Sequence, residues 1–181
     1  MSTSTPTRKN LQTSVAISES PLAQMHRFSV VRYHKMIDAG ILTVEDKVEL
    51  LEGLVLNKIS HHPSHAGTNL SILHEQPHLF TSDDYERMTE LGILNKDDRV
   101  ELLEGVIVDK MTQKPPHNVA VDLTRAALDE QLPEGWRLRE QKAIRLLGSE
   151  PEPDIAVVRG PIRRYATRHP IAKDIGMLVE V

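Results

Sequence analysis

The strongest constraint on the fold of this chain is an internal repeat. Residues 28–67 align without a gap with residues 80–119, at an offset of 52 positions, and 16 of the 40 aligned positions are identical. The most similar stretches are KVELLEGLVLNK, which begins at Lys47, and RVELLEGVIVDK, which begins at Arg99. A solenoid needs at least about three stacked units to bury a continuous core. We therefore expect a globular fold that contains a partial duplication.

Each copy has the pattern of a short helix followed by a β-hairpin. In the second copy, residues 81–84 (Thr-Ser-Asp-Asp) resemble a capping box, and apolar residues follow at helical spacing as far as Gly92. Two short apolar runs, 100–103 and 106–108, then flank Gly105, which can adopt the positive φ that a tight hairpin turn requires. The first copy repeats this pattern.

Only the second copy continues into further regular structure. The pattern predicts a helix from about His117 to Leu132, a strand from Trp136 to Leu147, a buried strand from Asp154 to Val158 and a last strand from Met177 to Val181. The predicted class is therefore α/β (α+β), with a mixed sheet flanked by helices and preceded by the partial helix-hairpin repeat.

The chain divides into three predicted segments. Residues 1–27 are rich in Ser and Thr and lack periodicity, which predicts a disordered N-terminal tail. Residues 28–79 form the partial repeat, and residues 80–181 form the domain. The last apolar strand stops at Val181 without the polar residues that usually finish a domain. We therefore expect a domain that is truncated at its C-terminus.

Composition excludes several classes of protein. With 39% hydrophobic and 27% charged residues and a net charge of -4, the chain has the composition of a soluble globular protein. It has no cysteine, which removes disulfides and thiolate metal sites and is typical of a reducing compartment. No apolar run approaches the roughly 20 residues that span a bilayer. We expect a cytoplasmic protein that does not enter a membrane.

Two acids stand out because they interrupt or border apolar strands. Asp154 precedes the run IAVV, and Glu180 lies within LVEV. A carboxylate in such a place is costly unless a cation receives it. Oxygen ligands of this kind suit Mg²⁺, which typically takes one or two protein carboxylates together with substrate phosphate. An exposed edge-strand acid or an ion pair with arginine is the alternative interpretation of each residue.

The order of the motifs resembles one known family. VELLEG, VIVDKM, PPH before a helix, SEPEPDIAVVRG and LVEV follow one another between residues 80 and 181. This order resembles the Uma family of endonucleases, which have the PD-(D/E)XK restriction endonuclease-like fold. Residues 28–79 resemble a partial duplicate of the opening segment of that family. The resemblance implies a Mg²⁺-dependent DNA endonuclease.

The resemblance also implies roles for single residues. Asp154 would be the aspartate of the PD half and Glu180 the acid of the (D/E)XK half, and both would bind Mg²⁺ or Mn²⁺. Glu101 and His117 match positions that recur in the opening segment of the family, as an additional acid and as a helix-start residue near the cleft. A solvated strand acid and a polar helix terminus are the alternatives for these two residues.

The motif also requires a lysine, whose ammonium group helps to position the attacking water and offsets developing negative charge. The plain motif places this lysine two residues after Glu180, and the resemblance places it further downstream, so that either position lies beyond Val181. Lys142 and Lys173 are the nearest substitutes, but neither occupies the position that the motif requires. The predicted endonuclease is therefore incomplete or inactive as this chain of 181 residues.

Basic residues predict where DNA would lie. A basic run from Arg159 to Lys173 contains no acid, and further basic residues between Arg137 and Arg145 precede it on another strand. Such a rim beside the acids would follow DNA phosphates with salt-sensitive affinity. A solubilising loop is the alternative.

The first copy does not predict a second active site. It keeps Glu49 and His65, but it has no counterpart of Asp154 or Glu180. Its HHPSH motif, residues 61–65, offers two histidines for zinc without a third ligand, so a solvated loop is the favoured interpretation.

Two further hypotheses follow from the partial duplication. The chain is a non-catalytic module that kept the nuclease fold and binds a nucleic acid or a protein, or its front repeat pairs with the counterpart in a second chain to make a homodimer. No small-molecule cofactor is implied.

Overall fold

The computed structural model describes residues 23–58 and 76–181, so that the HHPSH motif and residues 1–22 of the predicted tail lie outside the described residues. The helices are α1 (Val30–Asp38), α2 (Ser82–Glu90) and α3 (Pro115–Asp129). The strands are β1 (Val48–Leu51), β2 (Leu54–Asn57), β3 (Val100–Leu103), β4 (Val106–Asp109), β5 (Trp136–Glu140), β6 (Ile155–Arg159) and β7 (Ile175–Val179). The predicted mixture of helices and strands is confirmed.

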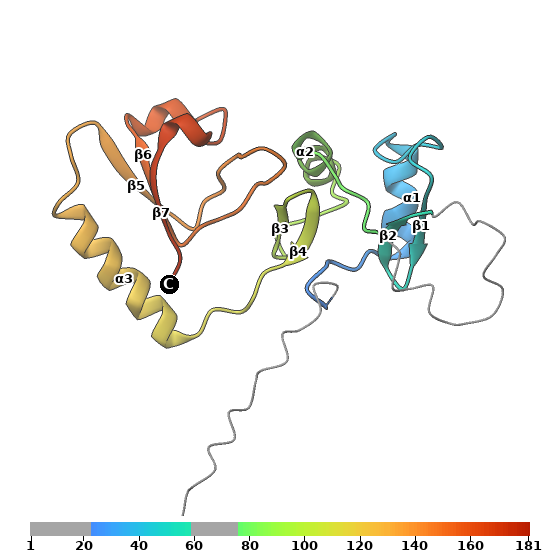
Figure 1. Ribbon diagram of the computed structural model, residues 1–181, viewed down its shortest axis with the longest axis horizontal. Coiled ribbons are helices and arrows are strands. Elements are labelled where there is room, and N and C mark those ends of the chain that lie inside the picture. The colour runs from blue at the N-terminus through green and yellow to red at the C-terminus, as the bar shows by residue number, and fades with distance from the viewer. Residues whose placement is uncertain (1–22, 59–75) are drawn as a thin grey trace, which may run out of the picture.

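The elements form a row (Figure 1). α1 and the β1–β2 hairpin lie at one end, the β5–β7 sheet with α3 lies at the other, and α2 with the β3–β4 hairpin lies between them. Within residues 23–58 and 76–181, no helix has both the length and the apolar character needed to cross a membrane.

The second copy folds as its local signals predict. The Thr81 side chain accepts a hydrogen bond from the Asp84 N–H (3.1 Å), and the Asp84 carboxylate accepts one from the Thr81 N–H (3.0 Å), so the capping box is complete. In the β3–β4 turn, Glu104 and Gly105 have φ of 49° and 83°, as a two-residue hairpin turn requires. The first copy has the same helix and hairpin at equivalent positions.

The two copies exchange the short segments that precede them. The segment that precedes each copy pairs with the hairpin of the other copy, through isolated bridges between Met25 and Val108 and between Pro77 and Leu56. The backbone hydrogen bonds, donor first, are His26 to Ile107 (2.9 Å), Asp109 to Gln24 (2.9 Å), His78 to Val55 (3.0 Å) and Asn57 to Gln76 (2.9 Å). Because each contact in one copy has its equivalent in the other, the two copies are related by approximate twofold symmetry.

This exchange corrects one expectation. Met25 is buried and paired with β4, so residues 23–27 belong to the folded part and not to a disordered tail. The front repeat also pairs with its counterpart within this one chain.

One hydrophobic core serves both copies. Met36 of α1 and Met88 of α2 are completely buried, and the rings of Phe28 and Phe80 lie 6.3 Å apart between centroids. The remaining buried members of this cluster are Ile41, Leu42, Val48, Val55, Ile93, Leu94, Val100, Leu102 and Ile107. The first copy is therefore packed into the fold through apolar surface.

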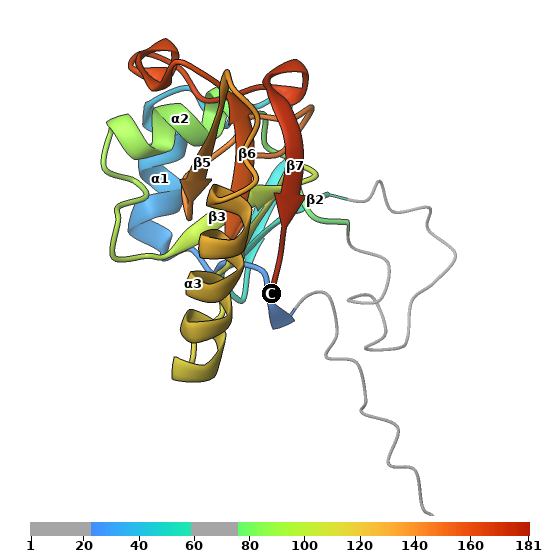
Figure 2. The ribbon, with the colours of Figure 1, turned by 90° about the vertical axis from the view of Figure 1, so that its left-hand side faces the viewer.

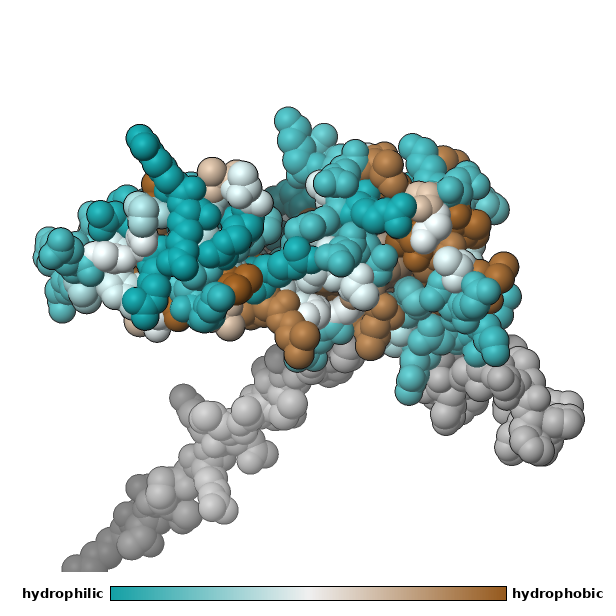
Figure 3. All heavy atoms as spheres, turned by 90° about the horizontal axis from the view of Figure 1, so that it is seen from above, coloured by the Kyte–Doolittle hydropathy of each residue, from teal (hydrophilic) through white to brown (hydrophobic). Residues whose placement is uncertain are grey.

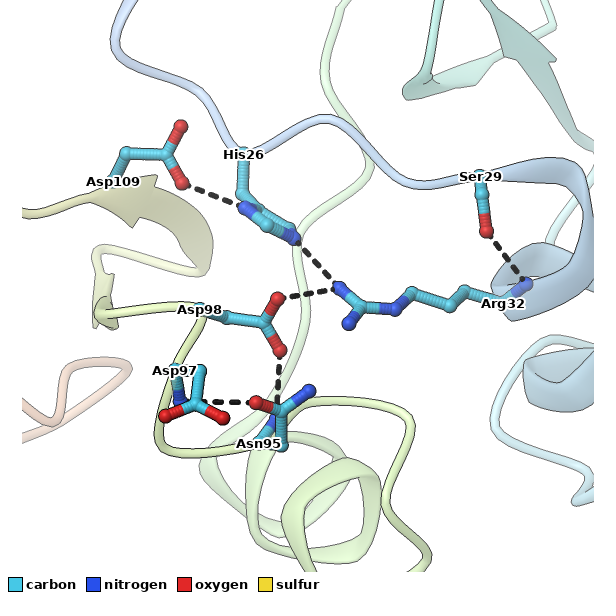
Figure 4. Close-up of polar contacts among 7 residues, drawn as sticks. All are labelled: His26, Ser29, Arg32, Asn95, Asp97, Asp98 and Asp109. Atoms are coloured by element: carbon cyan, nitrogen blue, oxygen red, sulfur yellow. Dashed lines mark hydrogen bonds and ion pairs between the residues drawn. The ribbon is translucent and has the colours of Figure 1, made fainter.

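Polar contacts at one edge of this interface connect the copies (Figure 4). Arg32 of the first copy donates to the Asp98 carboxylate of the second at 2.8 Å, and the His26 ring lies 2.6 Å from the Asp109 carboxylate. Burial opposes ionisation of Asp98, but the hydrogen bonds from Arg32 and from a backbone N–H prevail and lower its pKa. At the symmetry-related edge, the His78 ring contacts the Asn57 side chain instead.

The C-terminal sheet is antiparallel, in the order β5-β6-β7, rather than mixed as predicted. β6 lies in the middle and pairs antiparallel with both β5 and β7, and the connection from β6 to β7 contains two short 3₁₀ turns. α3 runs beside this sheet (Figure 2). The strand predicted to reach Leu147 ends at Glu140 because Gln141 adopts a positive φ of 46° and the chain bends there.

The loop between β5 and β6 attaches this sheet to the second copy. Arg145 pairs with Asp83 (2.5 Å) and Glu86 (3.1 Å) of α2, and with the buried Glu150 (3.3 Å). The Glu150 N–H donates to the Leu102 carbonyl oxygen of β3 at 2.8 Å. The hairpin of the second copy is thereby held against the end of the C-terminal sheet.

The surface differs between the two ends (Figure 3). Hydrophilic side chains cover most of the end that carries α3 and the sheet, and hydrophobic side chains gather at the end that carries α1. The exposed apolar residues of the first copy include Val30, Val31, Ile37 and Val44.

Candidate active site

Asp154 and Glu180 lie at the same end of two neighbouring strands. Asp154 immediately precedes β6 and Glu180 immediately follows β7. The two strands are antiparallel, and Ile155 pairs with Val179, so Asp154 and Glu180 are the next residues opposite each other. Directly opposite residues of an antiparallel pair have Cβ atoms about 5 Å apart and lie on the same face.

The Asp154 side chain is buried and held by specific contacts. Its Oδ2 accepts a hydrogen bond from the Val181 N–H at 3.0 Å, and its Oδ1 lies 3.1 Å from His117 Nε2. The other ring nitrogen of His117, Nδ1, lies 3.1 Å from the Val181 carbonyl oxygen. Both neighbours of the ring are acceptors, so only a protonated ring donates to both of them. His117 at the start of α3 thus fixes the orientation of Asp154.

The Glu180 carboxyl group lies near two other acids, Asp154 and Glu101. Partial burial raises its pKa, and the negative charges of Asp154 and Glu101 raise it further. A backbone hydrogen bond from Asp154 and the charge of His117 act in the opposite direction. Acids that disfavour each other's ionisation in this way can be stabilised together by a bound cation.

The four predicted site residues come together in one pocket. Glu101, on β3, accepts a hydrogen bond from the Glu152 N–H at 3.1 Å, and this contact joins the hairpin of the second copy to the segment before β6. A pocket of about 520 Å³ is lined by Glu101, His117, Asp154 and Glu180. The structure brings these residues together from a hairpin, a helix and two strand ends.

The two carboxylates at this site suit a metal ion that binds few protein ligands. Within the part of the chain that the structure describes, no three His, Asp or Glu side chains are close enough together to form a complete metal cage. Mg²⁺ does not require such a cage, because it usually keeps several waters and takes one or two carboxylates. Asp154 and Glu180 provide that number of carboxylates at neighbouring strand ends.

Sequence reasoning missed the cations that share this pocket. Arg99, Lys110 and Lys114 line it together with the acids, and the Lys110 ammonium group pairs with the Glu152 carboxylate. Neither Lys142 nor Lys173 lines it. Lys110 ends the repeated hairpin phrase, so the sequence does mark it, but the motif places its lysine after Glu180 and gives no reason to select Lys110.

The basic run from Arg159 to Lys173 does not border the acids. Arg159 ends β6, and Asp154 precedes its start, so the two Cα atoms are separated by roughly 16 Å of extended strand. Arg164 and Arg168 pair with the buried carboxylate of Asp174, at 3.6 and 2.7 Å. The prediction that residues 159–173 form a basic rim beside the cleft is therefore wrong, because this run lies at the opposite end of the sheet and stabilises its own loop.

The first copy offers no comparable arrangement among its described residues. Glu49 lies on β1 opposite Leu56 and is exposed. His65 lies outside the described residues. No strand end of the first copy corresponds to those that carry Asp154 and Glu180 in the region 23–58.

Comparison with known proteins assigns the chain to a family. The model of the family Uma2, described as "Putative restriction endonuclease", matches residues 82–181. No curated protein and no solved structure matches the chain. The matched residues contain α2, the second hairpin, α3, the C-terminal sheet and every residue that lines the pocket around Asp154 and Glu180 except Gln24. The chain belongs to the Uma2 family of restriction endonuclease-like proteins.

Proposed function

We propose that residues 80–181 form a Mg²⁺- or Mn²⁺-dependent DNA endonuclease domain that hydrolyses phosphodiester bonds at the pocket around Asp154 and Glu180. The observation that carries this proposal is the position of these two carboxylates, directly opposite each other at the ends of β6 and β7. Membership of the Uma2 family supports nuclease chemistry at this place.

The residues of the pocket would have different roles in hydrolysis. Asp154 and Glu180 would hold the ion, which when bound would activate a water molecule and stabilise charge on the scissile phosphate. His117 orients the Asp154 carboxylate through its 3.1 Å contact. Glu101 lines the same pocket and would accept a proton from a water bound there.

A non-catalytic binding module is the second candidate function. It is favoured by the ion pair between Lys110 and Glu152, which already engages the partly buried lysine of the pocket. Such a module would bind nucleic acid or protein without a metal ion and would not cleave DNA.

Cleavage of supercoiled plasmid by the full chain distinguishes the two functions. We expect nicking in Mg²⁺ or Mn²⁺, none in chelator, and loss of nicking in Asp154→Asn and Glu180→Gln. Glu134→Gln changes an exposed acid in the turn before β5 and serves as the matched control. Circular dichroism must show that all variants are folded. Nicking that survives Asp154→Asn would refute the endonuclease proposal, and wild-type binding of DNA without nicking would favour the module.

A further inference from the structure

A second pocket adjoins the acidic one. It has a volume of about 470 Å³ and shares Arg99, Lys110, Gln113 and Glu152 with the pocket around Asp154. The two pockets therefore form one continuous depression with acids at one side, and the shared residues stand between its halves.

The charge of the second pocket is opposite to that of the first. Lys96, Arg99 and Lys110 line it, and Glu152 is its only acid. Among the described residues, neither Lys96 nor Arg99 forms an ion pair, so two cations are available to a ligand. Neutral donors are also present, in the side chains of Asn95, Gln113 and Gln141. Cations combined with amide donors are the groups that bind phosphate oxygens.

Backbone pairing positions Arg99 and Lys110 next to each other. Arg99 adopts a positive φ of 47° before β3, and its carbonyl oxygen accepts a hydrogen bond from the Lys110 N–H at 2.8 Å. The two residues are therefore direct neighbours on the paired ends of the hairpin. The Tyr85 hydroxyl group donates to the Val100 carbonyl oxygen at 3.1 Å and ties α2 to the same hairpin. Burial raises the pKa of Tyr85 to about 12, so the hydroxyl group keeps its proton at neutral pH.

We propose that this pocket binds a phosphate group of duplex DNA that neighbours the scissile phosphate, with Lys96 and Arg99 as its principal contacts. The role of this pocket in cleavage rests on the proposed function, but the binding of a phosphate group by the pocket does not. Lys110 stands between the two phosphates and is paired with Glu152 when neither is bound.

The first copy provides a matched control for Arg99. Lys47 is its counterpart in the repeat, has nearly the same backbone conformation (φ of 49°) and is also exposed, but it lines neither of these two pockets. The counterpart of Lys96 is the apolar Val44. Arg163, an exposed member of the basic run, is a second control at the far end of the sheet.

Fluorescence anisotropy of a short labelled duplex tests the proposal, with the full chain in chelator so that no cleavage occurs. We expect Arg99→Ala and Lys96→Ala each to weaken binding about tenfold or more, and each to lower the salt dependence of log Kd by about one unit. Lys47→Ala and Arg163→Ala should bind as the wild type does. Thermal unfolding of each variant checks that the fold is unchanged.

The possible outcomes separate this pocket from the nuclease proposal. If the wild type does not cleave DNA but Arg99→Ala loses binding, the phosphate pocket stands and the endonuclease proposal falls. Equal losses in Lys47→Ala, or a loss in Arg163→Ala with none in Arg99→Ala, would overturn the phosphate pocket. A further outcome would also overturn it: calorimetric titration shows that the wild type binds inorganic phosphate, while anisotropy shows that it does not bind the duplex. The pocket would then bind free phosphate and not DNA.

Discussion

At the scale of single residues, the site depends on side chains whose surroundings are set by the hydrogen-bonded ends of strands. Asp154 and Glu180 could be recognised from sequence, because an acid beside an apolar run is unusual. The cations Arg99 and Lys110 could not be placed in the same pocket in this way, because their position depends on the docking of a hairpin against a distant sheet. Local signals identify residue types, and tertiary packing decides which of them meet.

The hairpin turn of the second copy requires glycine. Gly105 has a φ of 83°, and a Cβ atom added there would lie 2.9 Å from the Leu79 Cβ. We expect Gly105→Ala to lower the free energy of unfolding by about 2–3 kcal/mol, since a left-handed conformation alone costs about 1–2 kcal/mol and the contact adds to it. Gly92 has a similar φ of 63° but open space around it, so Gly92→Ala should lower the free energy of unfolding by less. Urea denaturation compares the two, and equal losses would contradict the steric part of this explanation.

Asp174 gives stability a defined dependence on pH. Its carboxylate accepts a hydrogen bond from Arg168 at 2.7 Å, and this bond lowers its pKa below 3.8 although burial acts in the opposite direction. Because the unfolded chain binds the proton at a higher pH than the folded one, the stabilisation is complete above the unfolded pKa and is lost as pH falls through the folded pKa. Asp174→Asn should therefore be less stable than the wild type at pH 7, with a difference that shrinks below about pH 4.

Urea denaturation between pH 7 and pH 3 measures this difference. Asp129→Asn, at the exposed end of α3, is the control that should show little change. A difference between Asp174→Asn and the wild type that stays constant across this range would show that the carboxylate charge does not contribute.

At the scale of elements, the duplicated helix and hairpin act as one symmetric pair. Sequence predicted each unit, because capping, helical spacing and the turn glycine are local signals. It did not predict that each hairpin takes its neighbouring segment from the other copy, because the pairing of Met25 with Val108 joins residues far apart in the chain. It also extended the strand after Trp136 too far, because nothing in the composition marks the bend at Gln141.

The shared core makes a prediction about the two helices. Met36 and Met88 occupy equivalent positions and are both completely buried in the same cluster. We expect Met36→Ala and Met88→Ala each to cost about 2–5 kcal/mol of unfolding free energy, in a single transition. Val44→Ala, at an exposed position, should change it by less than about 0.5 kcal/mol. A separate low-stability transition in Met36→Ala alone would show that the first copy unfolds independently.

At the scale of the whole molecule, the second hairpin links the first copy to the candidate active site. One side of it packs with the first copy, and the other carries Glu101, Arg99 and Lys110 into the pockets beside the C-terminal sheet. The fold class and the acids of this arrangement were predictable from the sequence. The position of the positive charge was not, because the basic run is continuous along the chain but lies at the wrong end of β6.

Calorimetric titration of the full chain with Mn²⁺ or Mg²⁺ tests most directly whether Asp154 and Glu180 hold a divalent ion. We expect one ion per wild-type chain, no binding at this site in Asp154→Asn or Glu180→Gln, and wild-type binding in Glu134→Gln, with similar thermal unfolding of all four proteins. A wild type that binds no ion, or an affinity unchanged in both site variants, would contradict the assignment of the metal site.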